Sequence, residues 1–280
     1  MPDLPYEVHP VRADLRPFVR RFLIADTTIR GSLRVRPAPT GYNYLSWYRG
    51  ERLRTIVDGV SRDVVEAFQL AGQIQRQSIE VIHDGPRIGH ILTEFTATGL
   101  ARLLHVPGDR ISGETVPLRR FAPAVADQLE AAVRDVPDSM SVRLSALQDA
   151  LVALSPRAAP PIDYLEAAVA LIEGSGGRMP VQEVAGAVGI SPRQLSRRFI
   201  DVVGCNPKFF AKVVQMNEAL AALLSDDTRK LTELCHEAGY FDQSHFVRVM
   251  HEFFGKAPTD FLESRDDVLA VFLGRAREVR

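Results

Sequence analysis

The sequence predicts an α+β protein in which an antiparallel β-rich domain precedes an all-α domain. Runs rich in β-branched and aromatic residues recur in the first half, whereas capped amphipathic helices follow one another in the second half. Between the halves, residues 155–161 hold three prolines, which stop a helix and stiffen a linker. A length of 280 residues suits two domains.

The first half, residues 1–154, contains five runs with β character, each bounded by Gly, Pro or Asp. They cover residues 21–29, 42–48, 55–60, 77–83 and 87–95. Their close spacing predicts an antiparallel sheet or a barrel. Apolar positions three and four residues apart then predict helices over 98–105, 121–136 and 141–154.

The last of these helices carries a heptad-like stripe of leucines at positions 144, 147, 151 and 154. Such a stripe suits either packing against the sheet or a dimer seam. Packing against the sheet is the favoured interpretation, because two turns are too few for a coiled coil.

The second β run is rich in aromatic residues, namely Tyr42, Tyr44, Trp47 and Tyr48. Aromatic side chains on a strand fill a core more often than they line a ligand pocket, so a core role is favoured. His83 and His90 fall on consecutive predicted strands, where a metal site is a minor alternative.

Other chemistry is not indicated. The seven histidines show no metal-ligand spacing, and the sequence contains neither a glycine-rich phosphate loop nor a serine nucleophile elbow. Two cysteines, Cys205 and Cys235, are too few for a disulfide scaffold or a four-cysteine zinc site. We therefore expect no metal, no cofactor and no enzymatic activity.

Composition places the chain among ordinary globular proteins. Hydrophobic residues make up 46% and charged residues 25%, which excludes wholesale disorder. No apolar stretch approaches the ~18 residues that span a bilayer, and residues 1–21 lack the apolar core of a signal peptide. These observations predict a soluble cytoplasmic protein with reduced thiols.

The second half contains an internal repeat of about thirty residues. At an offset of 50, the residues Glu183, Val184, Ala185 and Gly189 match Glu233, Leu234, Cys235 and Gly239. After one inserted residue, the residues Leu195, Arg197, Phe199, Gly204, Pro207 and Phe210 match Phe246, Arg248, Met250, Gly255, Pro258 and Phe261. An ordered series of this length indicates two copies of one supersecondary unit.

The repeated unit reads as a helix-turn-helix. In the first copy a short helix over 181–188 ends at Gly189, and Ser191 caps a second helix that runs to about Val203. Pro192 suits the first position of that helix, and Gln194 completes a capping box. In the second copy a helix over 231–238, a turn at Gly239 and the cap Asp242 repeat the plan up to Phe254. Ala185 and Cys235 are small where the two helices of each unit should cross.

Two further helices are predicted around these units. One covers 163–173, with Asp163 and Glu166 as a capping box. The other runs from Pro207 to about Leu224 between the units, and its length of about 27 Å suits two recognition helices held one DNA turn apart.

The second helix of each unit has an apolar face and a polar face. Leu195, Phe199 and Val202 face inward in the first copy, and Phe246, Met250 and Phe253 face inward in the second. The predicted DNA-binding residues lie on the opposite faces and are Arg193, Ser196, Arg197, Arg198, Gln243, Ser244, Val247 and Arg248. Arginine pairs bidentately with guanine, glutamine suits adenine, and valine contacts the thymine methyl group.

The segments 239–246 and 255–258, together with Arg248, resemble the signature of AraC/XylS-family transcriptional regulators. Segment 189–199 resembles the first helix-turn-helix of the same family. The resemblance covers about 162–262 and implies a domain with two helix-turn-helix units joined by a helix. In many members the N-terminal domain senses a small molecule.

This resemblance completes the predicted domain organisation. Residues 1–154 form an effector-binding or dimerisation domain, 155–161 a linker, 162–263 the double helix-turn-helix domain and 264–280 a C-terminal tail. We expect the two domains to be separate bodies with few contacts between them. The implied partners are double-stranded DNA, a small-molecule effector, a second copy of the chain and RNA polymerase, with no membrane.

Charge leaves an alternative function open. The net charge is −1, and residues 175–265 hold 11 basic and 11 acidic residues. Phosphate attraction supplies much of the affinity of DNA-binding proteins. The favoured prediction is a sequence-specific DNA-binding regulator, and the alternative is a regulator that acts mainly through protein–protein contact and binds DNA weakly.

Overall fold

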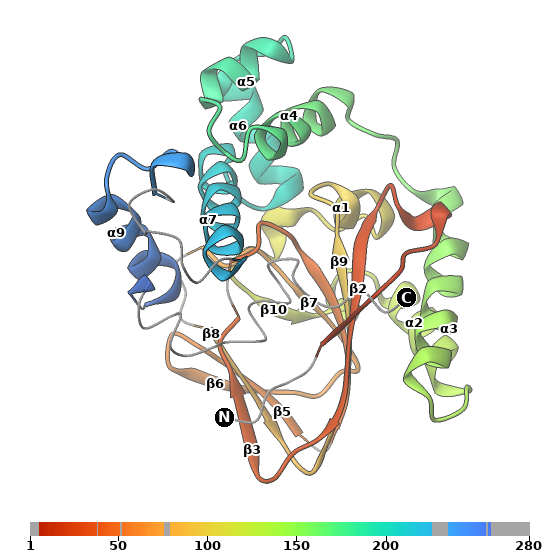
Figure 1. Cartoon of the computed structure of the whole chain (residues 1–280). Helices are drawn as coiled ribbons and strands as arrows, with labels where there is room; N and C mark the ends of the chain where they lie inside the picture. Colours follow the sequence, from red (N-terminus) through yellow and green to blue (C-terminus); the bar gives the residue numbers. More distant parts are fainter. Residues whose placement is uncertain are drawn as a thin grey trace.

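The structure is a computed structural model that describes residues 6–37, 39–50, 52–75, 79–225, 235–255 and 257–258. A β-rich body carries two helices, α2 and α3, on one side, while the C-terminal helices gather over another side (Figure 1). The predicted order of an antiparallel β-rich region followed by a helical region is confirmed. Within the described ranges, no helix combines the length and the apolar character needed to cross a bilayer.

The β-rich body consists of two antiparallel sheets. The six-stranded sheet has the order β1 (Glu7–His9), β2 (Val19–Thr28), β9 (Arg87–Phe95), β4 (Tyr44–Arg49), β7 (Phe68–Ala71) and β10 (Thr115–Pro117). The four-stranded sheet has the order β3 (Ser32–Val35), β8 (Ile79–Asp84), β5 (Arg52–Val57) and β6 (Val60–Val64).

Four of the five predicted β runs correspond to strands β2, β4, β8 and β9, although residues 77 and 78 of the fourth run lie outside the described residues. The run over 55–60 is wrong as one strand. Asp58 and Gly59 both have positive φ, 49° and 82°, and form the hairpin turn between β5 and β6. Four further strands, β1, β3, β7 and β10, have only three or four residues each and were not predicted.

Alternation along β9 divides the side chains between two environments. Ile91 and Phe95 pack on the face that α2 (Pro123–Arg134) and α3 (Met140–Leu154) cover. His90 and Leu92 point to the opposite face and line a cavity between the two sheets. The six-stranded sheet thus has a helix-covered face and a cavity face.

The leucine stripe of α3 belongs to the helix-covered core. Leu144, Leu147, Leu151 and Leu154 are buried together with residues of α2 and of the six-stranded sheet. The prediction of packing against the sheet is confirmed, and the alternative of a dimer seam is wrong. Burial of each leucine stabilises the fold by about 1.5–3 kcal/mol.

Short helical segments complete the first half. They are η1 (Ala13–Leu15), α1 (Gly99–Leu103), η2 (Gly108–Arg110), η3 (Leu118–Arg120) and η4 (Ser155–Arg157). The last of these continues directly from α3 into the proline-rich segment. Ala159 then donates its backbone N–H to the carbonyl of Arg102 at 2.8 Å, which ties the segment to α1.

The second half consists of helices around two small cores. One core joins α4 (Asp163–Gly174), α5 (Val181–Ala187), α6 (Pro192–Val203) and the start of α7 (Pro207–Ser225), and the other joins the end of α7 to α9 (Gln243–Phe254). The predicted helix over 231–238 is described only from Cys235, because residues 231–234 lie outside the described residues, as does the predicted tail 264–280.

The predicted capping box of α4 is wrong. Ile162 occupies the N-cap position and provides no side-chain cap. The Glu166 carboxylate instead accepts hydrogen bonds from Thr98 Oγ1 at 2.6 Å and from Arg102 Nη1 at 3.0 Å. Glu166 therefore joins the two halves of the chain rather than closing its own helix.

The expectation of two separate bodies with few contacts is also wrong. Tyr42 and Ala97, from the first half, are buried in the same core as α4, α5 and α6. Gly108 of η2 lies directly against the backbone of Gly204 at the end of α6. The predicted domain boundaries stay a prediction, but the two halves pack on each other.

Candidate nucleic-acid interface and ligand cavity

The two helix-turn-helix units share one backbone geometry. In the first unit Ile190 donates its N–H to the carbonyl of Ala185 at 3.1 Å, and in the second Tyr240 donates to Cys235 at 2.8 Å. Gly189 and Gly239 have φ of 73° and 78°, which favours glycine at both turns. The repeat that the sequence predicts is therefore present in the described part of both units.

Each second helix is capped at both ends. Ser191 Oγ accepts from the N–H of Gln194 and the Gln194 side chain accepts from the N–H of Ser191, as the predicted capping box requires. Asp242 Oδ1 accepts from the N–H of His245 at 2.7 Å. Both helices end at a left-handed glycine, Gly204 or Gly255.

Small residues lie where the helices of each unit meet. Ala185 and Cys235 are buried, and Cys235 is a free cysteine, like the buried Cys205. Burial raises the pKa of the Cys205 thiol, which makes that sulfur a poor nucleophile at neutral pH. Both cysteines thus act as packing residues.

The apolar faces of the recognition helices α6 and α9 point into the two cores. Leu195, Phe199 and Val202 are buried in α6, and Phe246 and Met250 are buried in α9. Phe253 is only half-buried, and Val249, which was not predicted, is buried as well.

The predicted DNA-binding residues lie outside these cores. Arg193, Arg197, Gln243, Ser244 and Arg248 are exposed, whereas Ser196, Arg198 and Val247 are half-buried. Their positions on α6 and α9 are equivalent, because Arg197 and Arg248 each lie six residues after the N-cap of their helix.

Three of these arginines have no ion-pair partner within the described ranges. They are Arg193, Arg197 and Arg248. By contrast, Arg21, Arg54 and many other arginines of the first half pair with acidic side chains. An exposed guanidinium without a carboxylate partner keeps its five donors available for phosphate or a base edge.

Two other charges near the recognition helices are already engaged. Arg198 contacts Asp201 at 3.6 Å and donates to the hydroxyl of Tyr164. Glu252 pairs with Lys212 of α7. The pairing of Arg198 with Asp201 reduces the attraction of the first unit for DNA phosphate. The pairing of Glu252 with Lys212 reduces the repulsion between the second unit and DNA phosphate.

Helix α7 sets the spacing of the two units. Its 19 residues extend for about 28 Å, which is close to one turn of B-DNA. Asn206 begins the helix by accepting from the N–H of Phe209 at 2.8 Å. The predicted linker helix is therefore present with the predicted length.

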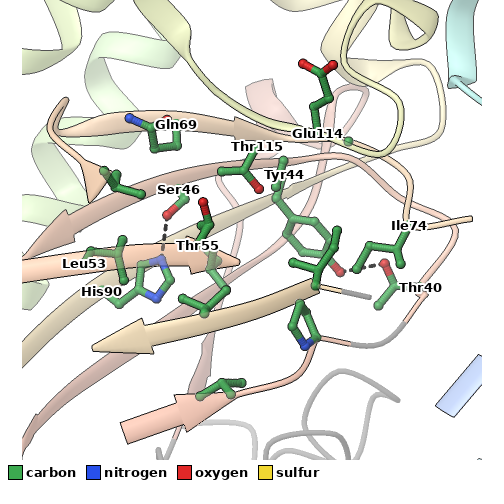
Figure 2. Close-up of a pocket in the computed structure, with 18 of the residues that line it drawn as sticks. Thr40, Tyr44, Ser46, Leu53, Thr55, Gln69, Ile74, His90, Glu114 and Thr115 are labelled. Carbon is green, nitrogen blue, oxygen red and sulfur yellow. Dashed lines mark hydrogen bonds between the residues drawn. The ribbon is translucent and has the colours of Figure 1, made fainter. Parts of the chain in front are cut away.

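A cavity of about 120 Å³ lies between the two sheets. Figure 2 shows Tyr44, Ser46, Leu53, Thr55 and His90 converging on it from β4, β5 and β9. Of the aromatic residues in the second β run, Tyr42 and Tyr44 line the cavity, whereas Trp47 lies in the helix-covered core. The favoured core role is thus right for Trp47, whereas Tyr42 and Tyr44 are buried in cores and also line the cavity.

The two histidines of the cavity are neutral. Burial lowers the pKa of His83 to about 4 and that of His90 to about 3. His90 uses both ring nitrogens, since Nδ1 bonds the Tyr6 hydroxyl at 2.7 Å and Nε2 bonds Ser46 Oγ at 2.6 Å. Among the described residues, no group of three or more His, Cys, Asp or Glu is placed to hold a metal ion.

The cavity wall continues into the interface between the two halves. The Thr40 carbonyl accepts from Asn217 of α7 at 3.4 Å, and the Tyr42 hydroxyl donates to Glu173 of α4. Next to the wall, Asn43 Nδ2 donates to the carbonyl of Val203 at 3.1 Å, and Gln75 Nε2 donates to that of Gly204 at 3.0 Å.

These last two bonds satisfy carbonyls at the C-terminal end of α6, which have no partner within the helix. The first half therefore caps the recognition helix of the first unit. The sequence carries no pattern that marks Asn43, Gln75 or Gly108 as interface residues, because each acts across more than 90 positions of the chain.

Comparison with known proteins agrees with this geometry. The family model of the helix-turn-helix domain matches residues 184–264. The comparison with curated protein sequences gave no match.

Most of the chain resembles solved structures of ToxT from Vibrio cholerae. One, at 1.65 Å resolution, shares 10% identity with a TM-score of 0.50, over 87% of this chain and 98% of that chain. Another, with an unsaturated fatty acid bound, also shares 10% identity with a TM-score of 0.50, over 86% and 94% of the two chains. At this identity the likeness shows a common fold.

A third structure, a transcriptional regulator with an AraC-type DNA-binding domain from Chromobacterium violaceum, is 25% identical over 37% of this chain and 92% of that chain, with a TM-score of 0.34. The family match coincides with the repeated, capped units described above. Residues 184–264 of the chain are therefore a helix-turn-helix domain of the AraC type.

Proposed function

We propose that the protein is a sequence-specific transcriptional regulator that binds double-stranded DNA with both recognition helices. The observation that carries this proposal is a pair of equivalent, exposed arginines, Arg197 in α6 and Arg248 in α9, which have no ion-pair partner among the described residues. A guanidinium at this position of a recognition helix reaches base edges in the major groove. Gln243, Ser244 and Val247 supply the remaining contacts of the second helix, and Arg193, Ser196 and Arg198 those of the first.

We further propose that the first half binds a small-molecule effector in the cavity between the sheets. The fatty acid bound to ToxT, a protein of the same fold, supports a ligand-binding role for this architecture. Occupation of the cavity would displace its wall, which includes Thr40 and Tyr42, and those residues contact α7 and α4 directly. The caps that Asn43 and Gln75 place on α6 carry the same displacement to the first recognition helix.

Binding titrations on DNA from upstream of the gene test the DNA-binding proposal. Arg197→Ala and Arg248→Ala should each cost roughly 1–3 kcal/mol on specific DNA and much less on unrelated DNA. Arg134→Ala is the matched control, because Arg134 is an exposed arginine on α2, outside the recognition helices. Its affinity should equal that of the wild type.

The two variants should differ. The first unit presents two unpaired cations, Arg193 and Arg197, and the second presents one, Arg248, within the described residues. Arg197→Ala should therefore cost more than Arg248→Ala, and the difference should shrink as salt rises. Equal losses would refute this asymmetry, and no loss from either variant would favour action through protein–protein contact. A homodimer and contact with RNA polymerase stay predictions from the sequence.

A further inference from the structure

The cavity between the sheets has a mainly apolar wall. Leu53, Val81 and Leu92 contribute to it from three different strands. A dry apolar cavity of about 150 Å³ holds one benzene molecule. The volume of about 120 Å³ therefore sets the size of a buried ligand at about one ring.

Most polar groups of the wall already have partners. The ring of His90 is held between Tyr6 and Ser46, and the latter bond is drawn in Figure 2. The Tyr44 hydroxyl bonds Thr40 and donates to Glu94 at 2.6 Å. These side chains position one another and leave little hydrogen-bonding capacity for a ligand.

Among the described residues, His83 lacks such a partner. Its side chain is 99% buried, it lines the cavity, and its Nδ1 has no hydrogen-bond partner within the described ranges. No hydrogen bond to its other ring nitrogen is formed there either. Tyr48 and His90 hold the ring by aromatic contacts, with centroids 5.3 and 5.9 Å away. A neutral imidazole has one donor and one acceptor, so a buried His83 favours a ligand that supplies the missing partner.

The charges around the cavity disfavour an anion. Within the described residues, no lysine or arginine lines the cavity. Its one acidic lining residue there, Glu114, is exposed, and its carboxylate points away from the labelled side chains (Figure 2). A buried carboxylate or phosphate ligand would lose its hydration without gaining a counter-charge.

We propose that this cavity binds an uncharged molecule of about single-ring size that carries a hydroxyl group, with the imidazole of His83 as the hydrogen-bonding partner of that hydroxyl. This ligand class rests on the proposed role of the first half as an effector-binding domain. The apolar wall takes up the ring, and His83 selects molecules with a hydroxyl over hydrocarbons of the same size.

Calorimetric titration of the full chain with phenol, toluene and benzoate tests the proposal. Phenol has the ring and the hydroxyl, toluene lacks the hydroxyl, and benzoate carries a charge. We expect the wild type to bind phenol and not benzoate. His83→Phe, which keeps a ring but removes both nitrogens, should weaken phenol binding about 10-fold, which corresponds to about 1.4 kcal/mol. Toluene binding should be unchanged or tighter.

Two further variants complete the design. His83→Gln retains a hydrogen-bonding group and should bind phenol better than His83→Phe does. His236→Phe makes the same substitution at an exposed histidine outside the cavity and should bind phenol like the wild type. His83→Phe should fold, because it removes a buried polar group that has no hydrogen-bond partner in the described part of the chain.

The proposal is overturned if benzoate binds as tightly as phenol, if phenol does not bind, or if His83→Phe binds phenol like the wild type. Each of these results leaves the proposed DNA binding untouched, because that is measured separately with the variants of Arg197 and Arg248. Conversely, if Arg197→Ala and Arg248→Ala do not weaken DNA binding, the conclusion drawn from the phenol titration still stands.

Discussion

The buried side chains of His83 and His90 make the free energy of unfolding depend on pH, and the structure predicts the direction and the approximate magnitude of that dependence. Imidazole in an unfolded chain has a pKa near 6.5. Burial lowers the pKa to about 4 for His83, where nearby Asp84 opposes the effect, and to about 3 for His90. Below pH 6.5 the two imidazoles are therefore protonated in the unfolded chain but stay neutral in the folded chain, down to about pH 4.

Acidification must then favour unfolding. Each pH unit within this window costs about 1.36 kcal/mol per histidine, so a change from pH 7.5 to pH 5.0 lowers the free energy of unfolding by about 2 kcal/mol for each. The two together account for about 4 kcal/mol, which is a large part of a typical total stability.

Urea unfolding of the wild type and of His83→Phe at the two pH values isolates one of these contributions. Titrating groups far from His83 are shared by both proteins and cancel in the comparison. His90 lies next to His83, and burial is the larger cause of its lowered pKa, which His83→Phe leaves in place. The fall in stability between pH 7.5 and 5.0 should be about 2 kcal/mol smaller in the variant than in the wild type. The control His236→Phe makes the same substitution at an exposed histidine outside the cavity, so it shows the general effect on stability of replacing a histidine with a phenylalanine. An identical pH dependence in His83→Phe and the wild type would refute the assignment of His83 as a buried neutral side chain.

Two further predictions concern the first recognition helix. In Gly108→Ala the new Cβ would lie 2.5 Å from the backbone N of Gly204, so the two halves must separate locally. Thermal unfolding should show a loss of stability of about 1–3 kcal/mol. The control is Gly174→Ala, whose Cβ would have no described atom within 4 Å and which should not lose stability. Ser191→Ala removes the N-cap of α6, so it should lower the free energy of unfolding by about 1 kcal/mol and should also lower the affinity for DNA. If urea unfolding and DNA titration both match the wild type, the cap contributes nothing to the helix.

The second half could be predicted closely from the sequence, because its signals are local. Ser191 and Gln194 are three residues apart, and their reciprocal hydrogen bonds fix the start of α6 whatever lies around it. The same holds for the glycines at 204 and 255, which end α6 and α9 in the left-handed conformation.

The first half was harder to predict because its structure depends on contacts between distant segments. Strands of three or four residues, such as β1 and β10, exist only because a longer neighbour pairs with them. The dipeptide Asp58-Gly59 is a local hairpin signal, and the prediction of one continuous strand over 55–60 ignored it. Glu166 shows the opposite error, since a plausible local cap is outcompeted by Arg102 and Thr98 from the other half.

The same distinction applies to the candidate sites. The outward residues of α6 and α9 follow from helical periodicity, so Arg197 and Arg248 could be found from the sequence. The cavity arises only when strands that are distant in the sequence come together, and the contact of Asn43 with the end of α6 joins residues 160 positions apart. The sequence marks His83 as a histidine on a strand, but it does not show that the side chain has no hydrogen-bond partner within the described ranges.

Hydroxyl-radical footprinting of the wild-type chain on DNA from upstream of its gene tests the central claim most directly, which is that α6 and α9 both enter the major groove. A helix α7 of about 28 Å between the two units should place them about one helical turn apart on one face of the duplex. We predict two protected segments centred about 10 base pairs apart, with Arg197→Ala weakening one and Arg248→Ala the other. A single protected segment that is lost in Arg197→Ala and unaffected by Arg248→Ala would contradict the use of both helices.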